Sequence, residues 1–498
     1  MTTLLEPEAA MQAGQQPRPQ TPNDIAVVDQ TLRDAHQCLW ATRMTTAHML
    51  PVAEKMDQIG FQRIEVIAAI QFDVCVRFLK ENPWERVRLM RKRMTRTPLS
   101  SFLRSKNIVS FDFVPDDIVG LWVERLVANG VREIGSFDGL NDVDNMLVAL
   151  DVARRLGART IGALSYCLSP VHTDALYVKT AKELVERGKV DAIWLKDAGG
   201  LLTVDRIRTL VPAVRRVVGR TPIELHSHCL TGVAPLVYLE GVKAGADRIH
   251  TSIAPLANGA AQPSIQSMAK NLRALGYRID VDDGLVANVS DHFRRIAEQE
   301  NKPMGQVLEY DTFHYEHQIP GGMLSNFRVQ LAELGLSHKF QELLEECACV
   351  RKELGYPIMI TPFAQFVGIQ AVLNVVHQER YRYVPDEVKK YALGYYGKLL
   401  APIDPDVLDR IVANGSRRIA LKPEPLAPAL AKLCRQYPEA SDDERALRIM
   451  FAGTQVDEML AAGPMRTDYY FEKPLVRLVR ELASRKMARV HFSAAGNG

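Results

Sequence analysis

Eight short apolar runs alternate with longer segments of helical periodicity between residues 23 and 283, and this alternation constrains the fold more than any other feature. Strands that alternate with helices form parallel sheets, and eight such units are typical of a (β/α)8 TIM barrel. A doubly wound open sheet is the alternative, because periodicity alone does not separate the two. The eight runs are Ile25–Val28, Ile64–Ile67, Leu99–Leu103, Ile134–Phe137, Thr160–Leu164, Ala192–Leu195, Ile223–Leu225 and Arg248–Ile253.

The remaining chain divides into three segments. Residues 1–22 carry four Gln and four Pro without apolar periodicity, and we expect a disordered tail there. Residues 284–470 lack strand signals and show helical patterns, which predicts a mainly helical domain that covers the mouth of a barrel formed by residues 23–283. Residues 471–498 are expected to form a C-terminal helix and tail, either on the surface or in contact with another chain.

Charge and cysteine content exclude several functional classes. A formal net charge of +3 is small for 498 residues and argues against a nucleic-acid-binding surface. The seven cysteines are scattered and lack a C-x-x-C pattern, which fits reduced thiols in a cytoplasm. The chain carries neither a signal-peptide pattern nor a run of about 18 apolar residues. We therefore expect a soluble, cytoplasmic protein without a membrane span.

Two histidines close the seventh apolar run, in the stretch Ile223-Glu224-Leu225-His226-Ser227-His228. Side chains at i and i+2 on a strand point to the same face, so His226 and His228 project side by side. Two imidazoles in this arrangement can bind one metal ion. The alternative is a pair of polar residues at a strand end without a metal.

Polar side chains also follow other runs, and in a barrel the carboxyl ends of the strands meet at one face. Lys196 directly follows a buried run, where loss of solvation lowers the pKa of an ammonium group. Addition of carbon dioxide to its neutral amine would give a carbamate, an oxygen ligand for a metal. Structural ion pairs are the alternative for Arg33 with Asp34 and for Lys196 with Asp197. The polar residues at strand ends are Arg33, Asp34, Gln37, Arg104, Asp138, Lys196 and Asp197.

The segment Thr31-Leu32-Arg33-Asp34-Ala35-His36-Gln37 resembles the opening motif of biotin-dependent carboxyltransferases that act on 2-oxo acids. This family includes the carboxyltransferase domain of pyruvate carboxylase, the matching subunit of transcarboxylase and the α subunit of oxaloacetate decarboxylase. The resemblance runs from about residue 26 to 460. Further matches are Phe72-Asp73, Leu103-Arg104, Phe137-Asp138, Leu195-Lys196-Asp197, His226-Ser227-His228, Gln318-Ile319-Pro320-Gly321-Gly322-Met323 and Ile360-Thr361-Pro362.

The resemblance implies a role for each matched residue. One divalent metal, by similarity zinc, cobalt or manganese, would be bound by Asp34, His226, His228 and Lys196 as its carbamate. The metal would polarise the substrate oxygen. Arg104 would bind the carboxylate of the 2-oxo acid. The other residues that the resemblance implies for substrate binding are Arg33, Gln37, Asp73 and Asp138.

Thr361 is the second catalytic residue that the resemblance implies, beside Lys196. Its hydroxyl would pass a proton between the biotin ring nitrogen and the methyl carbon of the 2-oxo acid. The alternative is an N-cap hydroxyl for a helix that begins near Phe363.

The chain departs from the family pattern at three places. Ile67–Gln71 replaces a Trp-Gly-Gly-Ala-Thr stretch, Phe111 replaces a tyrosine, and Gly135 replaces an arginine. In the family pattern these positions surround the pocket mouth. The metal ligands and Thr361 are retained, so carboxyl-transfer chemistry is expected, while the identity of the 2-oxo acid stays open.

The sequence contains no Ala-Met-Lys-Met biotin-attachment motif and no Gly-rich ATP-grasp region. We therefore expect biotin to arrive on a separate biotin carboxyl carrier protein, with a biotin carboxylase or a second carboxyltransferase subunit as further partner. A homodimer is also expected. Two alternatives are a metal-dependent aldol-type lyase or condensing enzyme of the hydroxymethylglutaryl-CoA lyase type, and a non-catalytic scaffold for a biotin carrier.

Overall fold

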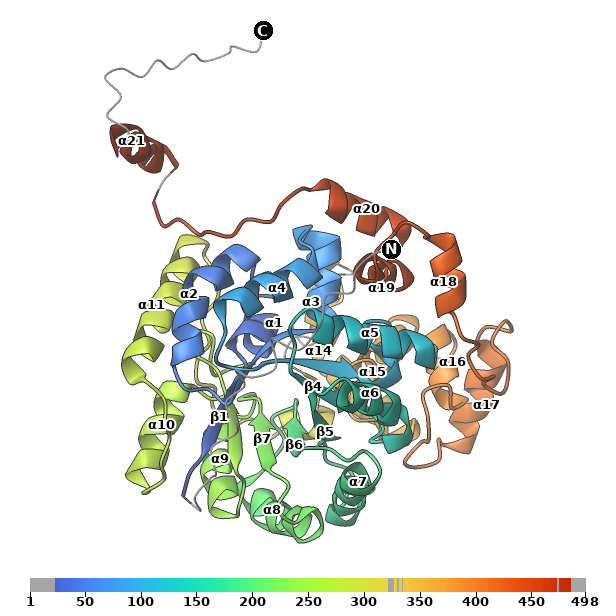
Figure 1. The fold of residues 1–498 in the computed structure, drawn as a ribbon. Coiled ribbons are helices and arrows are strands. Elements are labelled where there is room, and N and C mark those ends of the chain that lie inside the picture. The colour runs from blue at the N-terminus through green and yellow to red at the C-terminus, as the bar shows by residue number, and fades with distance from the viewer. Residues whose placement is uncertain (1–22, 321–326, 329–330, 334, 473, 485–498) are drawn as a thin grey trace.

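The computed structural model describes residues 23–320, 327–328, 331–333, 335–472 and 474–484. Eight parallel strands follow one another in chain order, and the eighth pairs with the first to close a barrel (Figure 1). The TIM barrel is confirmed, and the open sheet is excluded because a closed barrel has no edge strands. The strands are β1 (Ala26–Asp29), β2 (Arg63–Ala68), β3 (Leu99–Arg104), β4 (Glu133–Phe137), β5 (Arg159–Ser165), β6 (Ala192–Asp197), β7 (Ile223–Ser227) and β8 (Arg248–Thr251).

The strands are almost wholly buried, as expected for parallel strands covered by helices. Charged side chains nevertheless cross the barrel interior. Glu224 of β7 accepts hydrogen bonds from Arg63 of β2 at 2.8 and 2.5 Å, although these two strands are not neighbours in the sheet. Arg248 of β8 also donates to Glu224, at 2.7 Å. The buried charges are therefore paired, which offsets their loss of hydration.

Most helices around the barrel have a polar N-cap and a buried apolar face, as α8 (Val204–Val218) illustrates. Thr203 accepts a hydrogen bond from the backbone of Arg206 at the start of α8, and Gly219 follows its end. Ile207, Leu210 and other apolar side chains of α8 face the strands and are buried. The other helices of this layer are α2 (Thr46–Gln58), α4 (Pro83–Arg93), α5 (Asp116–Ala128), α6 (Val143–Arg155), α7 (Asp174–Glu186), α9 (Ala234–Lys243), α10 (Ile265–Ala274) and α11 (Asp283–Gln299).

The expected helical region follows the barrel. Leu343, Val350, Val367, Tyr391 and Ile411 form part of its own core and are nearly inaccessible to solvent. Its described helices of seven or more residues are α14 (Phe340–Glu353), α15 (Phe363–His377), α16 (Asp386–Ala392), α17 (Pro405–Asn414), α18 (Leu430–Gln436), α19 (Asp442–Met450), α20 (Gly453–Ala461) and α21 (Pro474–Ser484).

This region contacts the loops that follow β5 and β6, at the carboxyl ends of the strands. Arg351 of α14 donates to the backbone oxygen of Leu168 at 2.8 Å. The His314 ring lies 2.7 Å from the backbone oxygen of Gly199. The helical region therefore lies against the face of the barrel at which the polar residues were expected.

Some segments outside residues 23–283 belong to the barrel layer. Phe293 and Ile296 of α11 pack into the same core as the barrel helices, and so does Leu447 of α19. By contrast, α21 lies apart from the main body in Figure 1, and its Leu475 and Val479 side chains are exposed. Residues 1–22 and 485–498, and the motif residues Gly321, Gly322 and Met323, lie outside the described residues.

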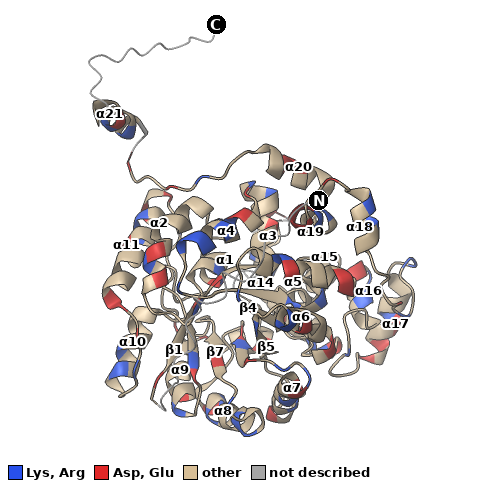
Figure 2. Cartoon of the chain, in the orientation of Figure 1, with Lys and Arg blue, Asp and Glu red and all other residues tan. Residues whose placement is uncertain are grey.

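Lys and Arg residues are interspersed with Asp and Glu residues over the outer helices, as Figure 2 shows. Such mixing agrees with the small net charge of +3. No helix among the described residues is long and apolar enough to cross a membrane.

Candidate metal centre and substrate site

Three expected metal ligands converge at the carboxyl ends of β1 and β7. The Asp34 Oδ2 atom lies 3.2 Å from His226 Nε2 and 3.2 Å from His228 Nε2. The two Nε2 atoms are also 3.2 Å apart, and all three side chains are buried. Asp34 lies in a short π-helical turn (Thr31–Ala35) directly after β1, so the strand and its turn together position this carboxylate.

The spacing of these donors fits one bound metal ion. Donor atoms that surround a tetrahedral zinc ion at about 2.0–2.1 Å are separated by roughly 3.3 Å. The three observed separations of 3.2 Å match that value. Two neutral imidazole nitrogens and a carboxylate are also the donor types that zinc, cobalt and manganese accept. Asp34, His226 and His228 therefore form a buried site that can hold a metal.

Outer hydrogen bonds orient both imidazole rings. His228 Nδ1 lies 2.6 Å from the carbonyl oxygen of Ala260, which can only accept, so Nδ1 carries the proton and Nε2 faces Asp34. His226 Nδ1 lies 3.2 Å from His250 Nδ1, and His250 Nε2 lies 3.1 Å from Glu224 Oε2. We assign a relay in which His226 donates to His250 and His250 donates to Glu224. Such partners fix the tautomer of metal-binding histidines.

The charges around Asp34 favour its ionised form. Burial alone would raise the pKa of Asp34, but Arg33 and the two histidines outweigh this effect and hold the pKa well below its usual range. Arg33 Nη1 lies 2.7 Å from Asp34 Oδ1, and Arg33 Nε lies 3.0 Å from Glu65. The ion pair that the sequence offered for Arg33 and Asp34 therefore forms. It coexists with the donor cluster, because Asp34 uses its other oxygen toward the histidines.

Lys196 extends from β6, in register with His226 of β7. Its ammonium lies 4.6 Å from the centre of the Trp194 ring, 5.9 Å from Phe102 and 5.8 Å from Phe137. Burial lowers the pKa of Lys196 below its usual value. The structure does not pair Lys196 with Asp197, since Asp197 accepts from the backbone of Leu201 and Leu202. A buried lysine with a lowered pKa is more readily neutral, and the neutral amine is the form that attacks carbon dioxide.

Arg104 extends from the end of β3 and is 8% exposed. Its guanidinium donates to the backbone oxygens of Ile108 and Val109, and its carbon lies 5.8 Å from the Phe111 ring centre. Burial lowers the pKa of Arg104 to about 10. Among the described residues, no carboxylate lies within ion-pair distance of this guanidinium. A buried cation with remaining donor capacity suits the carboxylate of a substrate.

The other four expected substrate residues occupy different settings. Asp138 accepts hydrogen bonds from the backbone of Leu140 and from the side chains of Ser105 and Asn145, which stabilises the turn after β4. Burial raises the pKa of Asp138 to about 6. Asp73 forms an ion pair with Arg77 at 3.2 Å on a partly exposed surface.

Gln37 is partly exposed, and its side-chain oxygen accepts no hydrogen bond from any described residue. Arg33 is committed to Asp34 and Glu65. Arg104 is therefore the expected substrate residue whose environment most favours an anion.

Thr361 lies in the turn before α15, and its hydroxyl accepts a hydrogen bond from Gln365 Nε2 at 3.2 Å. The sequence offered a helix cap as the alternative role. That alternative is wrong, because α15 begins at Phe363 with Pro362 as its N-cap and without a side-chain cap bond. Phe363 and Ile360 pack against Gly139, the residue after Asp138: a Cβ on Gly139 would lie 2.5 Å from the Phe363 ring. The turn therefore borders the end of β4.

The structure accounts for Gly135 and Gln71 among the departures from the family pattern, and it places Phe111 without explaining it. A Cβ on Gly135 would lie 1.8 Å from the Phe102 ring, so the packing of Phe102 leaves no room for a larger side chain. Gln71 accepts from the backbone of Ala68 and donates to the backbone oxygen of Arg33, and it thereby supports the turn that carries Asp34. Phe111 is 47% exposed beside Arg104.

Sequence reasoning missed three residues around the metal ligands: Glu224, His250 and Gln262. Gln262 lies after β8, and its side-chain nitrogen is 2.9 Å from Asp34 Oδ2. Glu224 lies two residues before His226 on β7, so the same alternation that paired His226 with His228 also points Glu224 into the barrel. The sequence held no comparable signal for Gln262, because it lies in a loop.

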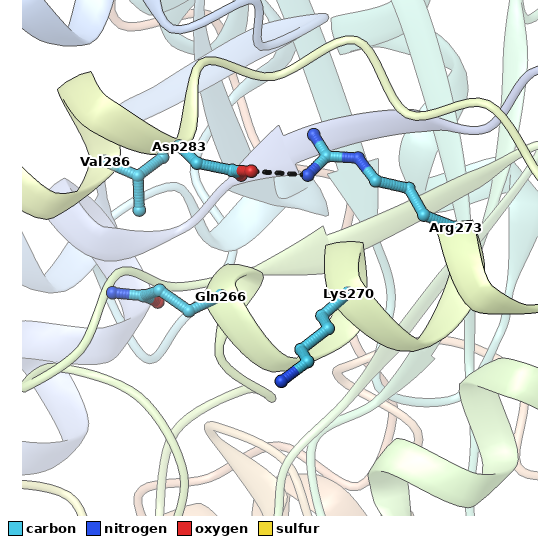
Figure 3. A pocket seen from close by; sticks show the side chains of 5 residues that line it. All are labelled: Gln266, Lys270, Arg273, Asp283 and Val286. Atoms are coloured by element: carbon cyan, nitrogen blue, oxygen red, sulfur yellow. Dashed lines mark hydrogen bonds and ion pairs between the residues drawn. The ribbon is translucent and has the colours of Figure 1, made fainter.

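A hollow lies between α10 and α11 on the outer layer of helices. Figure 3 shows Lys270 and Arg273 of α10 opposite Asp283 and Val286 of α11, with Gln266 beside them. Arg273 forms an ion pair with Asp283 at 2.6 Å. This hollow shares no residue with the donor cluster of Asp34, His226 and His228.

Comparisons with known proteins identify related carboxylases and carboxyltransferases. A family model described as a conserved carboxylase domain matches residues 315–459, and an HMGL-like model matches residues 143–292. A pyruvate carboxylase subunit of Methanocaldococcus jannaschii is 44% identical over 407 residues, which cover 81% of this chain and 71% of the relative. The methylmalonyl-CoA carboxyltransferase 5S subunit of Propionibacterium freudenreichii subsp. shermanii is 34% identical, over 91% of this chain and 88% of the relative.

A solved structure has the same architecture. The carboxyl transferase domain of Rhizobium etli pyruvate carboxylase, solved with pyruvate and biocytin, superposes with a TM-score of 0.80. It is 26% identical, and the match covers 88% of this chain and 78% of that one. The chain therefore belongs to the family of biotin-dependent carboxyltransferases that includes the Methanocaldococcus pyruvate carboxylase subunit and the 5S subunit of methylmalonyl-CoA carboxyltransferase.

Proposed function

We propose that this chain transfers a carboxyl group between carboxybiotin and a 2-oxo acid, with pyruvate and oxaloacetate as the substrate pair. The carboxybiotin is bound to a separate carrier protein. The observation that carries the proposal is the buried cluster of Asp34, His226 and His228 at the strand ends, in a chain of this family. The names of the Methanocaldococcus relative and of the solved domain support pyruvate as the substrate.

The side chains have distinct roles in this proposal. The metal, when bound, supplies a Lewis acid that polarises the 2-oxo oxygen of the substrate. Arg104 pairs with the substrate carboxylate and fixes the orientation of the 2-oxo acid. Thr361 accepts a proton from the substrate methyl carbon and gives its own to the biotin ring nitrogen that releases the carboxyl group. The methyl carbon then forms the new bond to the released carbon dioxide.

Lys196 is the fourth metal-binding residue in this proposal, as a carbamate. Its burial, its lowered pKa and its position beside His226 in the sheet register support this role. We expect Lys196→Ala to lose activity. The modification adds the mass of one carbon dioxide and is labile to acid, so native mass spectrometry or a crystal structure should detect it. An ammonium group that stays unmodified beside a bound metal would contradict this part.

Metal analysis combined with oxaloacetate decarboxylation tests the function. We expect about one divalent metal per chain and decarboxylation that is stimulated by free biotin. Turnover that depends on an acyl-CoA and ignores biotin would instead indicate an aldol-type lyase or condensing enzyme. The absence of both bound metal and turnover would indicate a non-catalytic scaffold.

The substrate and partners need separate tests. Because the positions of Ile67–Gln71, Phe111 and Gly135 differ from the family pattern, kcat/KM should be compared for pyruvate and larger 2-oxo acids. The Methanocaldococcus relative is named as one subunit of a pyruvate carboxylase, which supports an assembly with a biotin carrier and a biotin carboxylase. Co-purification with a biotinylated carrier would support that assembly. A homodimer and a cytoplasmic location remain predictions, which sedimentation and cell fractionation would check.

A further inference from the structure

The loop between β3 and α5 contacts both sides of the proposed active site. At its start, the guanidinium of Arg104 donates to two backbone oxygens of the loop. Further along, Asp112 accepts a hydrogen bond at 3.0 Å from the hydroxyl of Tyr396, a residue of the helical region that follows α16. The loop therefore joins the arginine expected to bind the substrate carboxylate to the region that carries Thr361.

Tyr396 packs directly against the start of α15. Its ring centre lies 5.9 Å from that of Phe363 and 5.3 Å from that of Phe366. Phe363 is the first residue of α15 and follows Thr361 by two positions. Tyr396 is 1% exposed, and burial together with the Asp112 carboxylate raises the pKa of its hydroxyl. The hydroxyl therefore stays protonated and acts as the donor to Asp112.

The residues around Tyr396 also contact a second barrel loop. Asn145 of α6 donates to the backbone oxygen of Tyr396 at 3.2 Å, and the backbone of Lys398 donates to Asp142 at 3.0 Å. Gly397 between them has a φ angle of +111°, and a Cβ there would lie 2.6 Å from the Asn145 side chain. This position therefore requires glycine. The turn at Tyr396 is attached to the barrel at two places, the loop after β3 and the start of α6.

We propose that Tyr396 is a positioning residue that holds the Thr361 hydroxyl in reach of the substrate. Its bond to Asp112 ties α15 to the same loop that Arg104 contacts, so the proton-transfer group and the substrate carboxylate share one support. Proton transfer requires hydrogen-bond reach between the two heavy atoms, and a displacement of about 1 Å can cost 10²-fold in rate. This inference rests on the proposed function, because that function assigns the proton transfer to Thr361.

Asp112 has a second partner, the Lys390 ammonium of α16 at 2.7 Å. The Asp112 side chain is 53% exposed, and ion pairs between exposed groups contribute little. Tyr396, by contrast, brings a buried ring and a direct contact with α15 to the same carboxylate. The hydroxyl of Tyr396 is therefore the group to remove first.

The test compares oxaloacetate decarboxylation with free biotin in Tyr396→Phe and Tyr395→Phe. Tyr396→Phe keeps the ring against α15 and removes only the hydroxyl. We expect kcat to fall about tenfold, the rate equivalent of a hydrogen bond to a charged group, while the KM for oxaloacetate and the melting temperature stay near those of the unmodified protein. Tyr395→Phe is the matched control and should leave kcat unchanged, because the Tyr395 hydroxyl donates to backbone oxygens of Ala420 and Lys422.

A second background shows whether the effect passes through Thr361. Tyr396→Phe should cost nothing further in Thr361→Ala, because a positioning residue has no effect once the group that it positions is absent. A loss of the same size in that background, or a normal kcat for Tyr396→Phe alone, would overturn this inference and leave the proposed function intact. Absence of biotin-stimulated decarboxylation in the unmodified protein would overturn the proposed function, and this inference with it.

Asp112→Ala removes the same hydrogen bond from the barrel loop, and it decides the matter should Tyr396→Phe fail to fold. We expect kcat to fall by the same factor as in Tyr396→Phe. The double variant should lose no more than either single variant, since both changes remove one bond. An unchanged kcat in Asp112→Ala, or losses that add in the double variant, would refute the proposal.

Discussion

The two sides of the proposed active site are held in very different ways. On the barrel side, Asp34, His226 and His228 are buried, and each forms contacts both to the others and to an outer partner. On the helical side, Thr361 is only partly buried, and its hydroxyl accepts a hydrogen bond from the side chain of Gln365. The barrel side is therefore organised before any ligand binds, whereas the helical side depends on one turn and on the packing of α15.

This contrast assigns metal binding to the barrel side and proton exchange to the helical side. Strands that pair in a closed barrel fix the positions of side chains at their ends, and preorganised donors bind a metal tightly. A hydroxyl that must exchange protons between two substrates needs access to both. Variants on the two sides should therefore separate metal binding from turnover.

The largest effect on turnover at unchanged metal content is expected on the helical side, for Thr361→Ala. Loss of a proton relay should reduce carboxyl transfer by about 10²–10⁴-fold. Metal content and melting temperature should stay near those of the unmodified protein, because Thr361 neither caps α15 nor contacts the donor cluster. Turnover, zinc content and thermal melting measured on one preparation check this prediction. Thr361→Ser should retain much of the activity, and more than about a tenth of normal turnover in Thr361→Ala would assign the proton transfer elsewhere.

The barrel side should give the opposite result. His226→Ala and His228→Ala each remove a direct metal ligand. Loss of a hydrogen-bond partner behind a ligand lowers metal affinity by up to roughly 100-fold, so loss of the ligand itself should lower the affinity further. Activity should then disappear together with the metal. His292→Ala is a matched control, since His292 is a buried histidine outside the donor cluster whose Nε2 atom lies 2.8 Å from the backbone oxygen of His48 on α2. Unchanged metal content in both ligand variants would refute the site.

The sequence predicted the barrel side more completely than its surroundings. The eight runs, and the alternation that brings His226 and His228 together, follow from strand geometry alone. The position of Asp34 also follows, since it comes directly after β1. His250 and Gln262 could not be placed, because their roles depend on how β8 and its loop meet β7 in three dimensions. The role of Thr361 came from the family resemblance and not from its local pattern.

The relay behind His226 offers a smaller effect on the barrel side. His250→Leu removes the acceptor of His226 Nδ1 and leaves Glu224 without one of its partners. Loss of an outer partner of a metal ligand typically lowers metal affinity by about 10–100-fold. Zinc competition on the folded variant measures this change, with thermal melting to confirm the fold. An affinity equal to that of the unmodified protein would mean that the strand alone orients His226.

The smallest effect concerns Gln365, which donates to Thr361 on the helical side. A hydrogen bond between neutral groups contributes about 0.5–1.5 kcal/mol, which corresponds to roughly a 2- to 10-fold change in rate. Gln365→Leu should therefore reduce turnover by about that factor and leave zinc affinity unchanged. If the bond acts only by orienting the Thr361 hydroxyl, Gln365→Leu should cost nothing further in a Thr361→Ala background, because the two residues then act as one unit. An equal loss in both backgrounds would show that Gln365 acts independently of Thr361, and the helical side would then hold two separate contributors to carboxyl transfer.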